Sequence, residues 1–124
     1  MNTKALAVAG TPQKYREFIQ GSKAEFGIAK SGYVAAQCGW FSDRSVCYLA
    51  SGRPVIAQET GFGRFLPVGD GLFAFTTPAD VLTAIERMNG DYARHSRAAR
   101  AIAEQYFDSD KVLSQLLQRI EEAA

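Results

Sequence analysis

The sequence is poor in the residues that build metal centres and in net charge, and each shortage excludes a class of site. It contains one histidine and two cysteines, Cys38 and Cys47, which cannot form a tetrahedral zinc site. Its 14 Lys and Arg residues nearly balance 13 Asp and Glu, so the net charge is +1. With its charges so nearly balanced, the chain has no excess of positive charge to attract nucleic acid or an anionic membrane. We therefore expect no metal, no cofactor and no nucleic-acid partner, and any phosphate chemistry must rest on a local site.

The chain also lacks a long apolar run. No stretch approaches the roughly 20 residues that cross a bilayer. The apolar part of the N-terminal MNTKALAVAG is too short for a signal peptide. Two cysteines without a CxxC motif are typical of reduced thiols. We expect a cytoplasmic protein with no membrane span.

The chain does contain enough hydrophobic residues to form one core. Its 124 residues are 47% hydrophobic, which suits a single domain over residues 1–124. Short apolar segments at 24–29, 55–57 and 72–75 predict buried strands, and Leu6 to Ala9 could be a further one. Because helical segments separate them, we expect a small parallel sheet flanked by helices.

Local capping signals place the helices between these strands. Thr11-Pro12 and Thr77-Pro78 each combine a hydroxyl cap with proline at the first helical position. Asp80 completes a capping box with Thr77, and Ser42 caps a helix that runs to about Ser51. The segment between the first strand and Ser42 is predicted to be a loop.

The last third of the sequence is helical. The segment from Tyr92 to Tyr106 has one apolar face. His95 lies on this face, and we expect it to be a half-buried residue that serves packing. Arg94, Arg97 and Arg100 are expected to form a solvated face. A final amphipathic helix carries an apolar stripe at Val112, Leu113, Leu116, Leu117 and Ile120.

No G-x-G-x-x-G motif opens the chain, unlike a complete doubly wound domain. The order of elements instead resembles the second half of a Rossmann-like domain with a helical C-terminus. In an open α/β sheet, ligands lie beyond the carboxyl ends of the strands. Two loops are predicted to reach that edge.

The first loop holds Gly39, Ser42, Asp43 and Arg44. A helix N-terminus at Ser42 offers unpaired N–H groups and a partial positive charge, which favour an anion. Gly39 allows close approach of the backbone, and Arg44 could bind a diphosphate as a fork of donors. The alternative is a capped helix in which Arg44 pairs with Asp43 or faces solvent. Trp40 and Phe41 beside it could stack on a base or pack beneath the loop.

The second loop, Glu59-Thr60-Gly61, leaves the strand at 55–57. Glu59 could accept hydrogen bonds from sugar or ribose hydroxyls. Thr60 and Gly61 could offer a hydroxyl and N–H groups to an oxyanion. A plain turn with a solvated Glu59 is the alternative.

The run from Trp40 to Phe62 (WFSDRSVCYLASGRPVIAQETGF) carries a resemblance to a known family. A helix ending in A-x-G-x-P before a strand is typical of the C-terminal domain of GT-B glycosyltransferases. The later strand at 72–75 and the T-x-x-D helix are also similar, so the resemblance covers roughly residues 11–120. The run as a whole resembles that of uncharacterised bacterial glycosyltransferase-like proteins.

The resemblance implies a fragment of a donor-binding domain that takes a nucleoside diphosphate sugar. It implies that the acceptor site lies in a missing N-terminal domain, so transfer by this chain alone is not expected. The glutamate with which many retaining members hold the donor ribose corresponds to Cys47, and an earlier acidic residue of the motif corresponds to Gly39. That ribose contact is absent unless Asp43 or Glu59 supplies it.

Two other hypotheses about the function remain open. A nucleotide-sugar epimerase of the hydrolysing type has the same architecture. A non-catalytic interaction module, with the apolar C-terminal helix buried in a homodimer, belongs to a different class.

Overall fold

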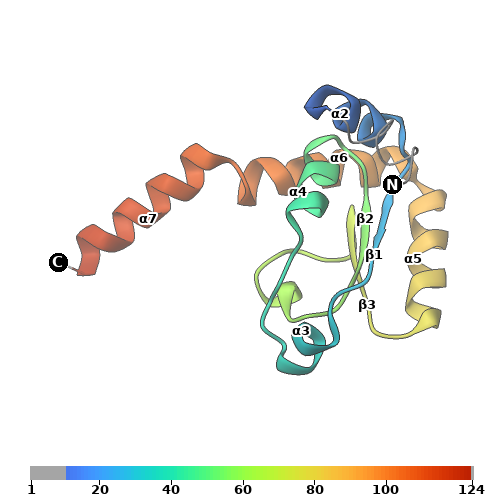
Figure 1. Cartoon of the computed structure of the whole chain (residues 1–124), viewed down its shortest axis with the longest axis horizontal. Helices are drawn as coiled ribbons and strands as arrows, with labels where there is room; N and C mark the ends of the chain where they lie inside the picture. The colour runs from blue at the N-terminus through green and yellow to red at the C-terminus, as the bar shows by residue number, and fades with distance from the viewer. Residues whose placement is uncertain (1–10, 124) are drawn as a thin grey trace.

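Three parallel strands form the centre of the protein (Figure 1). The computed structural model describes residues 11–123, without the side chains of residues 112, 115, 116 and 123. The strands are β1 (Glu25–Gly27), β2 (Val55–Gln58) and β3 (Leu72–Phe75), in the order β1-β2-β3. Phe26 lies opposite Ile56, and Ile56 opposite Phe73. The predicted α/β class and small parallel sheet are confirmed, whereas Leu6 to Ala9 lie outside the described residues.

Helices cover both faces of this sheet. The helices of eight or more residues in the described part of the chain are α2 (Pro12–Gly21), α4 (Asp43–Ala50), α5 (Pro78–Gly90), α6 (Tyr92–Tyr106) and α7 (Ser109–Ala123), of which α7 does not cover the sheet. The shorter ones are α3 (Ser31–Ala36) and a 3-10 turn, η1 (Phe62–Arg64).

The sheet is the middle of three layers (Figure 1). On one face, α2, α4 and α6 pack against the strands around Leu49, Val55, Leu72 and Ala99, all 0% exposed. On the other face, α5 packs through Ala84 and Met88 on Ile56, Phe73 and Phe75. A sheet covered on both faces explains why its strands read as continuous apolar runs.

The predicted caps are present. Thr11 Oγ1 accepts a hydrogen bond from Lys14 N at 3.1 Å. Thr77 Oγ1 accepts one from Asp80 N at 3.3 Å, and Asp80 Oδ2 accepts one from Thr77 N at 3.0 Å. A further bond from Thr76 N, at 2.9 Å, makes this carboxylate a double acceptor. These backbone hydrogen bonds lower the pKa of Asp80 below its ordinary value.

The prediction of a loop before Ser42 was wrong in part, because Ser31–Ala36 form α3. Lys30 at its N-cap position makes no side-chain capping bond, so the usual start signal is missing. The helix ends at Gln37, which adopts a left-handed conformation with φ 49°.

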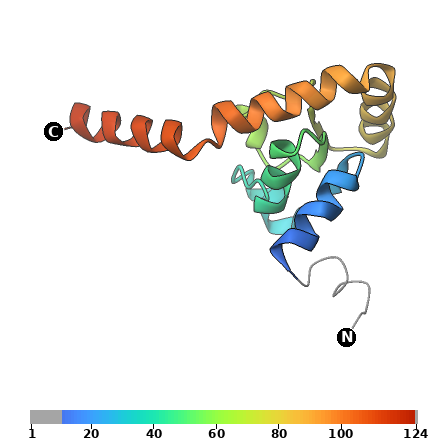
Figure 2. The same cartoon turned by 90° about the horizontal axis from the view of Figure 1, so that it is seen from above.

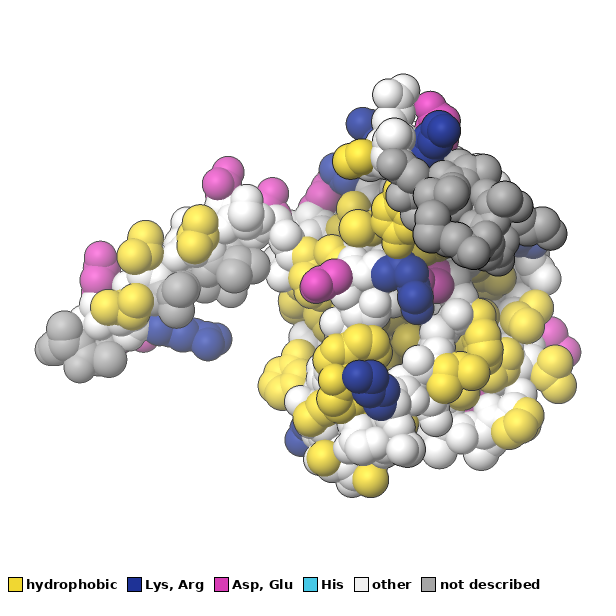
Figure 3. Space-filling view, viewed as in Figure 1, with side chains coloured by type: hydrophobic (Ala, Val, Ile, Leu, Met, Phe, Trp, Pro, Cys, Tyr) yellow, Lys and Arg dark blue, Asp and Glu magenta, His cyan; other side chains and the backbone are white. Residues whose placement is uncertain are grey.

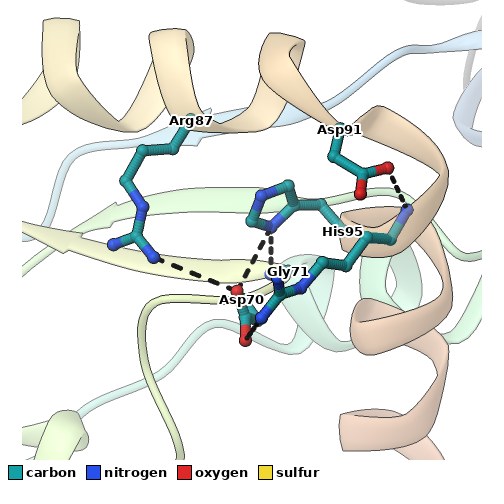
Figure 4. Close-up of polar contacts among 6 residues, drawn as sticks. Asp70, Gly71, Arg87, Asp91 and His95 are labelled. Carbon is teal, nitrogen blue, oxygen red and sulfur yellow. Dashed lines mark hydrogen bonds and ion pairs between the residues drawn. The ribbon is translucent and has the colours of Figure 1, made fainter.

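A polar cluster fixes the amino end of β3 (Figure 4). His95 is 4% exposed, more buried than expected, and its Nδ1 accepts a hydrogen bond from Gly71 N at 3.0 Å. Gly71 has φ +75°, and a Cβ there would lie 2.4 Å from the backbone N of Ala99. Beside it, Asp70 Oδ2 accepts a hydrogen bond from Arg94 at 3.0 Å, and Arg87 lies 4.0 Å from Oδ1. The contacts hold α5 and α6 against the start of β3.

The arginines of α6 were expected to form a solvated face, and this is confirmed: Arg94, Arg97 and Arg100 are all exposed, and two of them also have partners. Arg94 pairs with Asp70 as described above. Arg100 Nε pairs with Glu104 at 2.9 Å, and its Nη1 donates to Ala50 O at 2.5 Å. Arg100 therefore also holds α6 to the end of α4.

The last helix, α7, extends away from the rest of the protein (Figure 2). Leu113, Leu117 and Ile120 on it are 56%, 60% and 56% exposed. Hydrophobic side chains are visible along this helix in Figure 3. None of the helices in the described part of the chain is long and apolar enough to span a membrane.

Candidate functional site

A hollow opens at the carboxyl ends of β1 and β2, where α4 begins. Its cavity volume is about 20 Å³, room for about one water molecule, so a larger ligand would lie across the mouth of the hollow. Its walls come from three segments that are far apart in the sequence: Gly27, Ile28 and Ala29; Trp40, Phe41, Ser42, Arg44 and Ser45; and Ala57, Gln58 and Phe62.

The N-terminus of α4 forms the polar wall. Ser42 is its N-cap, and Ser42 Oγ accepts a hydrogen bond from Arg44 N at 3.1 Å. Among the described residues, the N–H groups of Asp43 and Ser45 have no hydrogen-bond partner. Two donors and the positive end of the helix dipole therefore favour an anion here. The exposed carboxylate of Asp43 occupies the same first turn and opposes it.

Arg44 has a partner that the sequence analysis did not predict. Its Nε lies 2.6 Å from Oε2 of Glu25, whose side chain is 5% exposed. Glu25 Oε1 also accepts a hydrogen bond from the Ser45 hydroxyl. The hydrogen bond and the negative charge of Glu25 raise the pKa of Arg44 above its ordinary value.

This pairing leaves part of the guanidinium at the hollow. A Cβ built on Gly27 would lie 4.0 Å from Arg44 Nη2, so the group extends over this strand end. The Arg44 side chain is 53% exposed. Among the described residues, only its Nε makes a side-chain hydrogen bond. Arg44 is therefore oriented by Glu25 and keeps further N–H donors, although the carboxylate of Glu25 offsets its positive charge.

Gln58 joins the ends of the two strands. Its Oε1 accepts a hydrogen bond from Ala29 N at 3.1 Å. Because Gln58 lines the hollow, its amide N–H₂ group is a second polar feature of the wall.

The loop after β2 supports the loop before α4. Thr60 is 0% exposed, and its hydroxyl donates to Trp40 O at 2.6 Å. In return, Gly39 N donates to Thr60 O at 2.6 Å. Gly39 itself has φ +85°, a conformation that favours glycine. In this arrangement Thr60 and Gly39 position Trp40 and do not line the hollow.

Glu59 and Gly61 form a turn of their own. Glu59 Oε1 accepts a hydrogen bond from Gly61 N at 2.7 Å. Gly61 has φ +96°, and its carbonyl accepts a hydrogen bond from Arg64 Nε at 3.1 Å. Neither residue lines the hollow.

The two aromatic residues before α4 have different environments. Phe41 is half-buried and contacts Phe62 and Phe107, with ring centroids 5.2 Å and 5.8 Å apart. Trp40 is 41% exposed and stacks on Tyr33, with centroids 5.1 Å apart. Packing therefore accounts for Phe41, whereas Trp40 remains available at the rim.

Of the seven residues predicted for the site, the structure brings two, Ser42 and Arg44, into the hollow. The most important residue that sequence reasoning missed is Glu25. Its position, an acidic side chain at the start of an apolar strand, could have indicated this role, because a buried carboxylate requires a partner.

Comparisons with models of protein families, with curated proteins and with solved structures found no match to this chain.

Proposed function

We propose that the chain is the donor-binding part of a GT-B-type glycosyltransferase and binds a nucleoside diphosphate sugar at the hollow. One observation carries the proposal: the N-terminus of α4, with Ser42 and Arg44, faces a hollow at the carboxyl ends of two parallel strands. This is where ligands bind in open α/β sheets. The resemblance of residues 40–62 to the GT-B donor motif points to the same place.

In this proposal the groups that line the hollow bind different parts of the ligand. The N–H groups of Asp43 and Ser45 and the remaining donors of Arg44 hold the diphosphate. The Gln58 amide donates to a ligand hydroxyl. The protein stabilises the charge that develops on the departing diphosphate, and the acceptor comes from another domain. Glu59 does not line the hollow, and its Oε1 is held by Gly61 N, so the proposal gives it no contact with the ligand.

Two acidic side chains near the site lead us to expect that the chain alone binds the diphosphate weakly. Glu25 neutralises part of the charge of Arg44, and Asp43 lies in the first turn of α4. We expect an affinity in the range of roughly 0.1–1 mM, several kcal/mol below that of a complete site. We expect no sugar transfer by the purified chain.

A second candidate function is an interaction module. The observation that favours it is the exposed stripe of Leu113, Leu117 and Ile120 on a helix that extends from the body. Light scattering during gel filtration tests whether a homodimer buries it. A dimer that Leu117→Glu converts to a monomer, together with no response to nucleotides, favours this function over the first.

Calorimetric titration with UDP, GDP, TDP and ADP tests the main proposal. We expect one of them to bind and Arg44→Ala to weaken it by about tenfold, the loss of one charge-assisted contact. Arg97→Ala, which removes an exposed arginine from α6, is the control and should bind like the wild type. A well-folded protein that binds none of the four contradicts the proposal.

A further inference from the structure

Trp40 is a partly exposed aromatic residue just before the N-terminus of α4. Trp40 is one of the residues that line the hollow, and it is 41% exposed. Tyr33 does not line the hollow and stacks on the indole, at an interplanar angle of 28°. Tyr33 therefore backs the ring from outside the hollow. Lys30 Nζ in turn lies 5.8 Å from the centroid of the Tyr33 ring.

Two hydrogen bonds fix the loop at Trp40. The fully buried Thr60 donates its hydroxyl hydrogen to Trp40 O, and Gly39 N donates to Thr60 O, both at 2.6 Å. The first bond satisfies the buried hydroxyl and fixes the carbonyl of Trp40, and the Tyr33 ring packs on the indole itself. The indole is thus held in place before any ligand arrives, which lowers the cost of binding.

We propose that Trp40, backed by Tyr33 and positioned by Thr60, is the wall against which the glycosyl ring of the donor stacks. The inference rests on the proposed function and adds the part of the ligand that this wall recognises. A pyranose ring has an apolar C–H face and polar edges. The partly exposed Trp40 suits the first, and the amide of Gln58, which also lines the hollow, suits the second.

Trp40 lies close along the chain to the anion-binding groups, because Ser42, the N-cap of α4, is two residues after it. A ring that contacts Trp40 therefore lies near the phosphate that this helix end holds. The glycosyl ring and the ribose are each bonded to a phosphate, whereas the base is separated from the diphosphate by the ribose. Of the two rings, only the glycosyl ring is lost when the sugar conjugate is replaced by the bare diphosphate.

The test compares each nucleoside diphosphate with its glucose conjugate. UDP and UDP-glucose, and the GDP, TDP and ADP pairs, are titrated by calorimetry against the wild type and Trp40→Ala. We expect Trp40→Ala to weaken the sugar conjugate by about tenfold and the bare diphosphate by less than twofold. Trp40→Phe should keep most of the affinity, and Phe18→Ala, an exposed aromatic residue on α2, should change neither.

Fluorescence gives an independent readout, because Trp40 is the single tryptophan. We expect its emission to change with the sugar conjugate and to respond little to the diphosphate. Equal effects of Trp40→Ala on both ligands, or no change in emission on saturation, would overturn the inference and leave the proposed function standing.

If none of the four pairs binds, the proposed function fails. The wall is then tested by titrating methyl glucoside against Trp40 emission. A saturable change that Gln58→Ala weakens supports a ring-binding wall, and no change overturns it.

Discussion

The guanidinium of Arg44 and the carboxylate of Glu25, 19 residues apart in the sequence, lie 2.6 Å apart between Nε and Oε2. This pair ties the first turn of α4 to the first residue of β1. It thereby fixes the mouth of the hollow, since Ser45 of the same turn also donates to Glu25. The arginine that sequence reasoning assigned to ligand binding has a structural partner as well.

The first prediction measures this coupling. In a double-mutant cycle of Glu25→Gln and Arg44→Gln, we expect a coupling energy of about 1–2 kcal/mol in the free energy of unfolding. It should fall below that of a fully buried pair because the Arg44 side chain is 53% exposed. The control cycle uses the exposed pair of Arg100 and Glu104, for which about 0.3–0.5 kcal/mol is expected. Equal coupling in the two cycles would show that burial of Glu25 adds nothing.

The second prediction concerns the turn into β3. Gly71→Ala would place a Cβ 2.4 Å from Ala99 N, in a left-handed conformation with φ +75°. We expect it to lower the free energy of unfolding by about 2–4 kcal/mol or to prevent folding. Gly90→Ala at the end of α5 meets nothing within 4 Å and should be neutral or stabilising by up to about 1 kcal/mol. Urea denaturation measures both, and a stable Gly71→Ala protein would contradict the packing of β3 on α6.

The third prediction is a pH dependence at the start of α5. The pKa of Asp80 is lowered in the folded state by hydrogen bonds from Thr76 and Thr77. Its stabilising contribution is therefore present above its unfolded pKa, about 3.9, and is lost as the pH falls through the folded value. Asp80→Ala should lower the melting temperature at pH 7, and the difference from the wild type should shrink toward pH 3.

The matched control for this prediction is Glu86→Ala, which removes an exposed carboxylate from the same helix. It should show no such difference at pH 7. A difference between Asp80→Ala and the wild type that is constant down to pH 3 would rule out a contribution from the charge.

The fourth prediction concerns α7. A variant that ends at Asp108 removes Leu113, Leu117 and Ile120, which are more than half exposed, and keeps the stacking of Phe107 on Phe41. We expect its melting temperature to stay within a few degrees of that of the whole chain, because little packed surface is lost. A large fall would mean that α7 is covered in solution, as in a homodimer.

The sequence predicted the framework well where the signal was local. Cap residues such as Thr11, Ser42 and Thr77 determined the starts of α2, α4 and α5, and short apolar runs marked all three strands. The helix α3 was missed because Lys30 offers no cap and Gly32 weakens the helical signal.

The site was harder to predict because its contacts join distant segments. That Ser42 and Arg44 lie close together could be predicted, because both belong to the start of one helix. The burial of Thr60 under Trp40 and the pairing of Glu25 with Arg44 each depend on residues 19 or 20 positions apart in the sequence. No local pattern reveals which of a residue's polar groups the fold itself uses.

The most direct test of the account is an NMR titration of the uniformly ¹⁵N-labelled protein with the nucleoside diphosphate sugar that binds most tightly in calorimetry. We predict that the amide shifts change mainly at residues 27–29, 40–45 and 57–58, around the hollow. The polar cluster of Asp70, Gly71 and His95, at the amino end of β3, should stay unchanged. Shifts confined to that cluster, or no shifts with UDP-, GDP-, TDP- or ADP-glucose at millimolar concentration, would contradict a donor site at the N-terminus of α4.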